Sequence, residues 1–246
     1  MKIVTVVRQV PDAEARVRIE EGAVALSGAA WVLDGMDEYG VEEALRLRDG
    51  GSEVEILALA LGPERSEEAL RTALSLGADR ALLLVAAEEP DPLPAAKRLA
   101  EAIRAEGADL VFVGGKQADW DSAALGPALA EALGWPLADW TTSLQLEDRV
   151  LQVVHDADGG AEQMSLPLPA VVSTQQGLNE PRYPTLPNIM KARRKELRFE
   201  PAGQLPAPVR TVGRTLEQHD RQGRIVSGST TEAVQQLAEV FEGVSQ

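Results

Sequence analysis

Three aspartates with the potential for acid–base chemistry lie near the ends of predicted strands: Asp12, Asp34 and Asp37. General acid–base catalysis needs a second positioned group, such as a histidine or a nucleophile, and no such partner accompanies them in the sequence. In a chain with 39 acidic residues, we interpret all three as solvated loop carboxylates.

Composition excludes several other kinds of site. The chain has no cysteine, which removes disulfides, thiolate metal sites, iron–sulfur clusters and cysteine nucleophiles, and which fits a reducing compartment. The two histidines, His155 and His219, lie far apart in the sequence, so we expect neither a histidine-based metal site nor a Ser-His-Asp triad. A formal net charge of −15 argues against general nucleic-acid binding.

Glycine-rich segments are the remaining candidates for a ligand site. The segment Gly114-Gly115-Lys116-Gln117 follows a predicted strand, but it matches neither G-x-G-x-x-G nor a P-loop. In segment 121–127, Ser122 can cap a helix whose first N–H groups could hold an anion. Spacing alone favours a capped helix without a ligand.

The elements that must position these residues alternate between strand and helix in the first half of the chain. Near-continuous apolar strands separated by helices predict a doubly wound, mostly parallel sheet that is covered on both faces. Its strand-to-helix loops then meet at one edge, where such sheets bind ligands. The predicted strands are 2–7, 54–61, 81–85 and 110–113, the predicted helices are 37–48, 66–76, 94–105 and 122–133, and a small hairpin is predicted at 17–26.

The pattern changes after about residue 140. Residues 150–154 and 163–166 predict an antiparallel hairpin extension, and 170–173 predict another buried strand. Segment 195–229 is polar and rich in proline and glycine, which indicates an extended arm, and an amphipathic helix is predicted at 231–241. We therefore expect a domain at 1–194 and, at 195–246, an arm that ends in a helix.

The chain begins with an apolar strand and has no basic lead, so we expect no targeting peptide. No apolar stretch is long enough to span a bilayer, so a cytoplasmic protein without direct membrane insertion is expected.

Segment 183–190 mixes apolar residues with prolines, which block regular helix and strand. A loop that carries Leu186, Ile189 and Met190 either folds inward or is offered to a partner. A basic cluster follows, which could dock an acidic partner or simply be solvated. Its members are Lys191, Arg193, Arg194, Lys195 and Arg198.

The run LNEPRYPTLPNIMKA at 178–192 closely resembles the β subunit of electron transfer flavoproteins. Segments 154–174, 114–118 and 41–47 also fit this family, and the resemblance is weakest between 198 and 229. The resemblance implies a nucleotide-hydrolase-like α/β domain that forms a heterodimer with an α subunit. It further implies that segment 183–192 is a recognition loop with Leu186 as its anchor. The docking residues implied are Tyr183, Leu186, Pro187, Ile189, Met190, Lys191 and Arg194.

The resemblance also implies a function and its cofactors. The family carries electrons without a catalytic site in this subunit, accepting them from acyl-CoA dehydrogenase-type flavoenzymes in fatty acid oxidation and passing them towards the respiratory chain. The α subunit holds most of the redox FAD. The β subunit binds a structural AMP, and electron-bifurcating members hold a second FAD in its place.

The family's AMP site maps onto four segments of this sequence. The residues concerned are Val6, Asp34, Leu61, Gly62, Asp121, Ser122, Ala123, Ala124, Leu125 and Gly126. Two departures bear on the site. Asp34 stands where the family usually has an asparagine. Ala124 and Leu125 stand where the family usually has a glutamine together with a valine or a threonine. An added carboxylate disfavours a nearby phosphate, and a lost amide removes a hydrogen bond. Ala13 stands where some members place a tyrosine near the flavin.

Two alternatives stay open beside the carrier subunit. One is the β subunit of an electron-bifurcating flavoprotein with a second FAD. The other is a free-standing nucleotide-hydrolysing α/β protein, which the missing P-loop and the intact 178–192 run disfavour.

Overall fold

The computed structural model describes residues 1–15, 18–20, 23–26, 28–119, 121–213, 215, 223 and 225–244. The chain divides into two units, Met1–Val17 with Ala25–Val212, and Arg18–Val24 with Gly213–Gln246. The first unit contains the main sheet and all the residues predicted to bind the nucleotide. It also contains segment 183–192, which was predicted to dock a partner.

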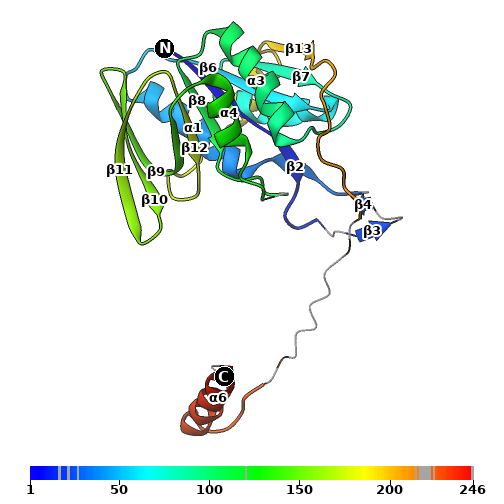
Figure 1. Cartoon of the computed structure of the whole chain (residues 1–246), viewed down its shortest axis with the longest axis vertical. Helices are drawn as coiled ribbons and strands as arrows, with labels where there is room; N and C mark the ends of the chain where they lie inside the picture. The colour runs from blue at the N-terminus through cyan, green and yellow to red at the C-terminus, as the bar shows by residue number, and fades with distance from the viewer. Residues whose placement is uncertain are drawn as a thin grey trace. The chain divides into compact units, whose positions relative to one another are not determined.

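A nine-stranded sheet organises the first unit, in the order β11-β10-β9-β12-β8-β1-β6-β7-β13 (Figure 1). The strands from β9 across to β13 pair in parallel, whereas β10 and β11 form an antiparallel hairpin at one end. This arrangement confirms the predicted fold class. The strands are β1 Lys2–Val6, β6 Glu55–Gly62, β7 Arg80–Val85, β8 Leu110–Gly114, β9 Leu137–Glu147, β10 Val150–Ala157, β11 Gly160–Pro167, β12 Ala170–Thr174 and β13 Leu197–Pro201.

Two hydrophobic cores, one on each face of the sheet, hold the helices in place. Along β1, Ile3 packs into one core and Val4 into the other, as the alternation of side chains in a strand requires. Helices α1 and α2 pack on the first core, and α3 and α4 on the second (Figure 1). The helices are α1 Gly35–Asp49, α2 Glu67–Leu76, α3 Pro92–Glu106 and α4 Leu125–Leu133.

A short 3₁₀ turn, η1 Glu64–Ser66, precedes α2, so the predicted helix at 66–76 begins one residue later than expected. Ser66 occupies the N-cap position of α2 but makes no side-chain capping hydrogen bond. Near this turn, β2 Gln9–Pro11 pairs antiparallel with β5 Trp31–Leu33 and forms a small second sheet.

The expected start of the arm at residue 195 is too early. Strand β13 pairs in parallel with β7 and extends the main sheet by one edge strand. An edge strand pairs on one side only and stays half exposed, so its polar composition concealed it. Lys195, just before β13, donates to the carbonyls of Leu74 (3.0 Å) and Ala78 (2.5 Å) at the end of α2.

The second unit contains a two-stranded sheet of β3 Arg18–Glu20 and β4 Ala23–Ala25, together with α6 Thr230–Val244. These elements confirm the predicted hairpin and C-terminal helix, while Val17, Glu21, Gly22 and His219 lie outside the described residues. Within the described part of the chain, no helix is long and apolar enough to cross a membrane.

Candidate functional site

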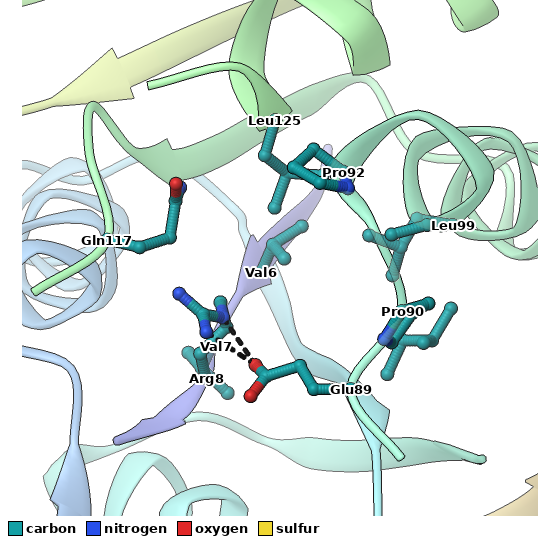
Figure 2. A pocket seen from close by; sticks show the side chains of 11 residues that line it. Val6, Val7, Arg8, Glu89, Pro90, Pro92, Leu99, Gln117 and Leu125 are labelled. Carbon is teal, nitrogen blue, oxygen red and sulfur yellow. Dashed lines mark hydrogen bonds and ion pairs between the residues drawn. The ribbon is translucent and has the colours of Figure 1, made fainter. Parts of the chain in front are cut away.

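A pocket lies at the carboxyl edge of the sheet, near the ends of strands β1 and β8. Strands β1 and β8 are neighbours, and the helices that follow them lie on opposite faces. Open α/β sheets bind ligands outside the carboxyl ends of the strands at such a switch point. The pocket is open to solvent, and its cavity volume is about 40 Å³, which is room for only a few water molecules. Its lining residues are Val6, Val7, Arg8, Leu61, Glu89, Pro90, Pro92, Ala95, Leu99, Gln117 and Leu125 (Figure 2).

The pocket brings together only part of the predicted nucleotide site. Val6, Leu61 and Leu125 line it. The other predicted residues do not: Asp34, Gly62, Asp121, Ser122, Ala123, Ala124 and Gly126. A Cβ atom on Gly126 would lie 3.5 Å from Ser173 and from Val113, so this position faces the sheet.

The loop before α4 differs from the prediction. The helix begins at Leu125 rather than at residue 122, because Asp121 and Ala123 adopt φ angles of 58° and 50°, which are incompatible with a right-handed helix. The side chain of Ser122 donates to Oε1 of Gln117 (2.8 Å) instead of capping the helix. The predicted cap is therefore wrong, but Ser122 orients Gln117, which lines the pocket.

Two of the three aspartates interpreted as solvated are buried. Asp34 is 1% exposed and Asp37 is 5% exposed, whereas Asp12 remains partly exposed. Asp34 caps α1 by accepting the N–H of Met36 (3.0 Å), and its second oxygen accepts the N–H of Ala118 (3.0 Å). The solvated interpretation is wrong for both residues because backbone amides take the place of water.

Asp37 joins the carboxyl ends of β1 and β8. Its Oδ2 accepts the N–H of Arg8 (2.8 Å), and its Oδ1 accepts the N–H of Gly114 (2.9 Å). Burial and the charge of Asp34 raise the pKa of Asp37 well above its ordinary value, while Arg8 and the two amides oppose that rise. A Cβ atom on Gly114 would lie 2.6 Å from Asp37 Oδ1, so the close approach requires glycine. Asp37 therefore fixes the geometry of this edge.

Arg8 is a mostly buried cation in the lining of the pocket. Its side chain is 11% exposed and forms ion pairs with Glu89 (2.6 Å) and Asp119 (3.1 Å). Burial acts to lower the pKa of Arg8, but the two carboxylates raise it above its ordinary value. Neither Arg8 nor Glu89 was predicted from the sequence. The signal available was their position, since each follows an apolar strand at the edge where parallel sheets bind ligands.

A second candidate surface surrounds α5 Leu186–Ala192. The expectation that prolines block a helix here is wrong: Pro187 occupies the first turn, where a backbone N–H is not needed. Thr185 caps the helix by accepting the N–H of Asn188 (3.4 Å). We call the apolar side chains of this segment the α5 surface. Its exposed members are Tyr183 (93%), Leu186 (79%), Ile189 (37%) and Met190 (60%).

The basic cluster beside the α5 surface separates into two groups. Lys195 binds carbonyls at the end of α2, and Arg198 pairs with Glu106, so these two side chains stabilise the fold. The other three residues are exposed and form no ion pair with residues that the structure describes: Lys191, Arg193 and Arg194. Among the described residues, no group of three or more histidine, aspartate or glutamate side chains could hold a metal ion.

Fold and pocket together define a doubly wound α/β protein with a small pocket at the switch point of its sheet. A family model described as electron transfer flavoprotein domain matches residues 21–203. The chain is 38% identical over 199 residues to the electron transfer flavoprotein subunit beta of Bradyrhizobium diazoefficiens, covering 80% of each protein. It is 36% identical over 246 residues to the mitochondrial subunit beta of Oryza sativa subsp. japonica, covering 96% of this chain and 97% of the relative. Against subunit beta of Homo sapiens it is 36% identical over 211 residues, covering 83% of each. The chain belongs to the electron transfer flavoprotein family.

Proposed function

We propose that this chain is the β subunit of a heterodimeric electron transfer flavoprotein and has no catalytic site of its own. It accepts electrons from acyl-CoA dehydrogenase-type flavoenzymes and passes them towards the respiratory chain, with the redox FAD held mainly by the α subunit. The observation that carries this proposal is the α5 surface, an exposed apolar anchor on a firmly held segment of a chain from this family.

The α5 surface is suited to docking because its base is fixed. Arg71 of α2 donates to the carbonyls of Ala192 (3.0 Å) and Lys195 (3.2 Å), and Ala192 itself is buried. A segment that is already ordered loses little conformational entropy on binding. Leu186 at the exposed start of α5 is then the natural anchor for an apolar pocket on a dehydrogenase. The proposed docking residues remain Tyr183, Leu186, Pro187, Ile189, Met190, Lys191 and Arg194.

AMP is the nucleotide proposed for the pocket at the switch point. The apolar side chains of Val6, Leu61 and Leu125 suit a base or ribose, and the backbone N–H groups of Leu125 and Gly126 at the start of α4 suit a phosphate. The proposed site keeps the ten residues implied by the resemblance. Those that do not line the pocket are proposed to shape the loops around it.

The C-terminal part of the second unit, from residue 213 onward, is proposed to pack on the α subunit. Helix α6 exposes Val234, Leu237 and Val240, an apolar face that needs a surface to cover it. The test is truncation after residue 212, which leaves β13 and the main sheet intact. We expect the truncated chain to associate with α at least tenfold more weakly. A truncated chain that forms a full-strength heterodimer would contradict this assignment.

One experiment tests the proposed function as a whole. The chain is co-expressed with the α subunit encoded in the same genome, and the purified complex is denatured so that the released nucleotides can be identified by mass. We expect one FAD and one AMP for each heterodimer, and reduction of that FAD by an acyl-CoA dehydrogenase with its substrate. Two FADs and no AMP would indicate the bifurcating alternative. A chain that binds stoichiometric FAD without α would contradict the proposed division of cofactors.

A further inference from the structure

The side chain of Arg8 crosses the carboxyl edge of the sheet above the pocket. Its Nε donates to Oε1 of Glu89 (2.7 Å) (Figure 2). Its two terminal nitrogens donate to the carboxylate of Asp119 (3.1 and 3.2 Å). Glu89 belongs to the loop after β7, and Asp119 to the loop after β8. Because the strand order is β8-β1-β6-β7, these contacts span the ends of four adjacent strands. We call the three residues the Arg8 bridge.

The Arg8 bridge carries more negative than positive charge, and one of its two carboxylates, that of Glu89, belongs to the pocket lining. One guanidinium faces two carboxylates, and Glu89 and Arg8 both line the pocket. The carboxylates are only about a quarter exposed, at 28% for Glu89 and 27% for Asp119, so water screens them weakly. A phosphate that entered the pocket beside an intact bridge would meet the carboxylate of Glu89 and a cation whose donors are mostly occupied.

The guanidinium of Arg8 has the chemistry that a phosphate needs. It presents a fixed fork of N–H donors that fits the oxygens of a phosphate as well as those of a carboxylate. Arg8 and Leu125, the first residue of α4, line the same pocket, so the guanidinium lies in the same site as the start of this helix. The apolar lining supplied by Val6 and Leu61 suits only the uncharged part of that ligand.

We propose that Arg8 is the phosphate-binding residue of this pocket, and that Glu89 and Asp119 occupy it until the phosphate of a nucleotide displaces them. The proposal rests on the proposed function, which places a nucleotide here. Binding then exchanges one set of charge-assisted hydrogen bonds on Arg8 for another. It also releases the loop after β7 from the loop after β8, so nucleotide affinity depends on how strongly the two acids compete.

The test compares a charged with an uncharged probe. The full-length chain is freed of bound nucleotide, and the affinities of AMP and adenosine are measured by calorimetry. We expect Glu89→Gln and Asp119→Asn each to strengthen AMP binding about tenfold, because each removes a competing charge-assisted hydrogen bond. We expect Arg8→Gln to weaken AMP binding at least tenfold. Adenosine should change less than about twofold in all three variants, since it carries no phosphate. Glu88→Gln is the matched control, because Glu88 is exposed and adjacent to Glu89 but does not line the pocket.

The possible results distinguish failure of the Arg8 bridge proposal from failure of the proposed nucleotide site. If adenosine and AMP bind but the Glu89 and Asp119 variants match Glu88→Gln, the nucleotide site stands and the bridge is overturned. If only those two variants bind AMP, the bridge is supported and structural AMP in the natural protein is overturned. If no variant binds either probe, both proposals fall. Circular dichroism checks the fold of Arg8→Gln, and the two acid variants carry the test if Arg8→Gln does not fold.

Discussion

Arg182 and Glu42 form a two-pronged ion pair that fastens the segment before α5 to helix α1. Nε of Arg182 lies 2.8 Å from Oε2 of Glu42, and Nη2 lies 2.9 Å from Oε1. The Glu42 side chain is only 7% exposed, so this carboxylate would be costly to bury without its partner. Asn179 adds hydrogen bonds to the carbonyl of Tyr39 (3.0 Å) and to Glu43 (2.9 Å). The stretch that leads into the α5 surface is therefore held along the length of α1.

Substitution of Glu42 by glutamine should loosen this attachment. We expect Glu42→Gln to lower the free energy of unfolding by about 1–2 kcal/mol, because one of the two charge-assisted hydrogen bonds from Arg182 is lost. Amide hydrogen exchange of residues 178–192 should become faster while the central strands stay protected. Asp49→Asn is the control, since Asp49 contacts the same arginine (2.9 Å) but is 56% exposed. We expect its effect to stay below about 0.5 kcal/mol. Equal effects of the two variants would contradict the assigned role of Glu42.

Helix α1 offers a matched pair of glycines that tests how closely it packs on the sheet. A Cβ atom on Gly40 would lie 2.9 Å from the Cβ of Phe112, whereas one on Gly35 would meet nothing within 4 Å. Gly40→Ala should destabilise the fold by about 1–3 kcal/mol through overpacking. Gly35→Ala should be neutral or stabilise by up to about 1 kcal/mol through the unfolded state. Chemical denaturation of the two variants measures both. Equal stability would show that α1 can shift away from β8 without cost.

Glu106 should give stability that depends on pH. It lies at the end of α3 and pairs with Arg80 of β7 (2.8 Å) and with Arg198 of β13. Burial acts to raise the pKa of Glu106, but hydrogen bonds from the two arginines lower it below the ordinary value. A lowered pKa in the folded state stabilises the protein above the unfolded-state pKa, and this contribution is lost as pH falls through the folded-state pKa.

The variant Glu106→Gln should therefore be less stable than the natural chain at pH 7 by about 1–2 kcal/mol. The difference should shrink as pH falls below about 4.5, the ordinary pKa of a glutamate. Urea denaturation across this pH range is the measurement. Glu101→Gln is the control, because Glu101 is mostly exposed and its ion pair with Arg98 is long, at 3.6 Å. A destabilisation by Glu106→Gln that is the same at pH 3 and pH 7 would rule out the ion pairs as its cause.

The sequence predicts the buried elements of this fold better than its edges. The strand expected at 110–113 is β8 Leu110–Gly114, since a strand buried on both faces must be nearly all apolar. Edge strand β13 was missed because an edge needs no such run. Helix α5 was missed because Pro187 was read as a breaker, although a proline in the first turn is compatible with a helix.

The site was predictable where it depends on strand ends and less so where it depends on loop conformation. Val6 and Leu61 line the pocket, and the resemblance to the family implied both of these strand-end positions. The positive φ of Ala123 delays the start of α4, and composition does not report it, because alanine rarely adopts that conformation. The burial of Asp37 was equally hidden, since its partners are backbone amides of distant segments, which a sequence pattern does not reveal.

The last prediction concerns the anchor of the α5 surface. Leu186 is 79% exposed on the first turn of α5, so its truncation should leave the core and the bound nucleotides unchanged. If it fills an apolar pocket on a dehydrogenase, Leu186→Ala removes about three methyl or methylene equivalents at roughly 0.8 kcal/mol each. The expected loss is about 2 kcal/mol, or roughly 30-fold in affinity.

The measurement is electron transfer from a reduced acyl-CoA dehydrogenase to the complete heterodimer, as a function of dehydrogenase concentration. Leu93→Ala is the matched control, because Leu93 is also an exposed leucine in the first turn of a helix, α3, which packs on the opposite core. We expect the half-saturating concentration to rise about 30-fold for Leu186→Ala and to stay within about twofold for Leu93→Ala. Removal of Lys191, Arg193 and Arg194 should instead slow association and reduce its salt dependence, because exposed charges act mainly on encounter. If both leucine variants transfer electrons with the same half-saturation, Leu186 does not anchor the dehydrogenase, and the α5 surface serves another contact.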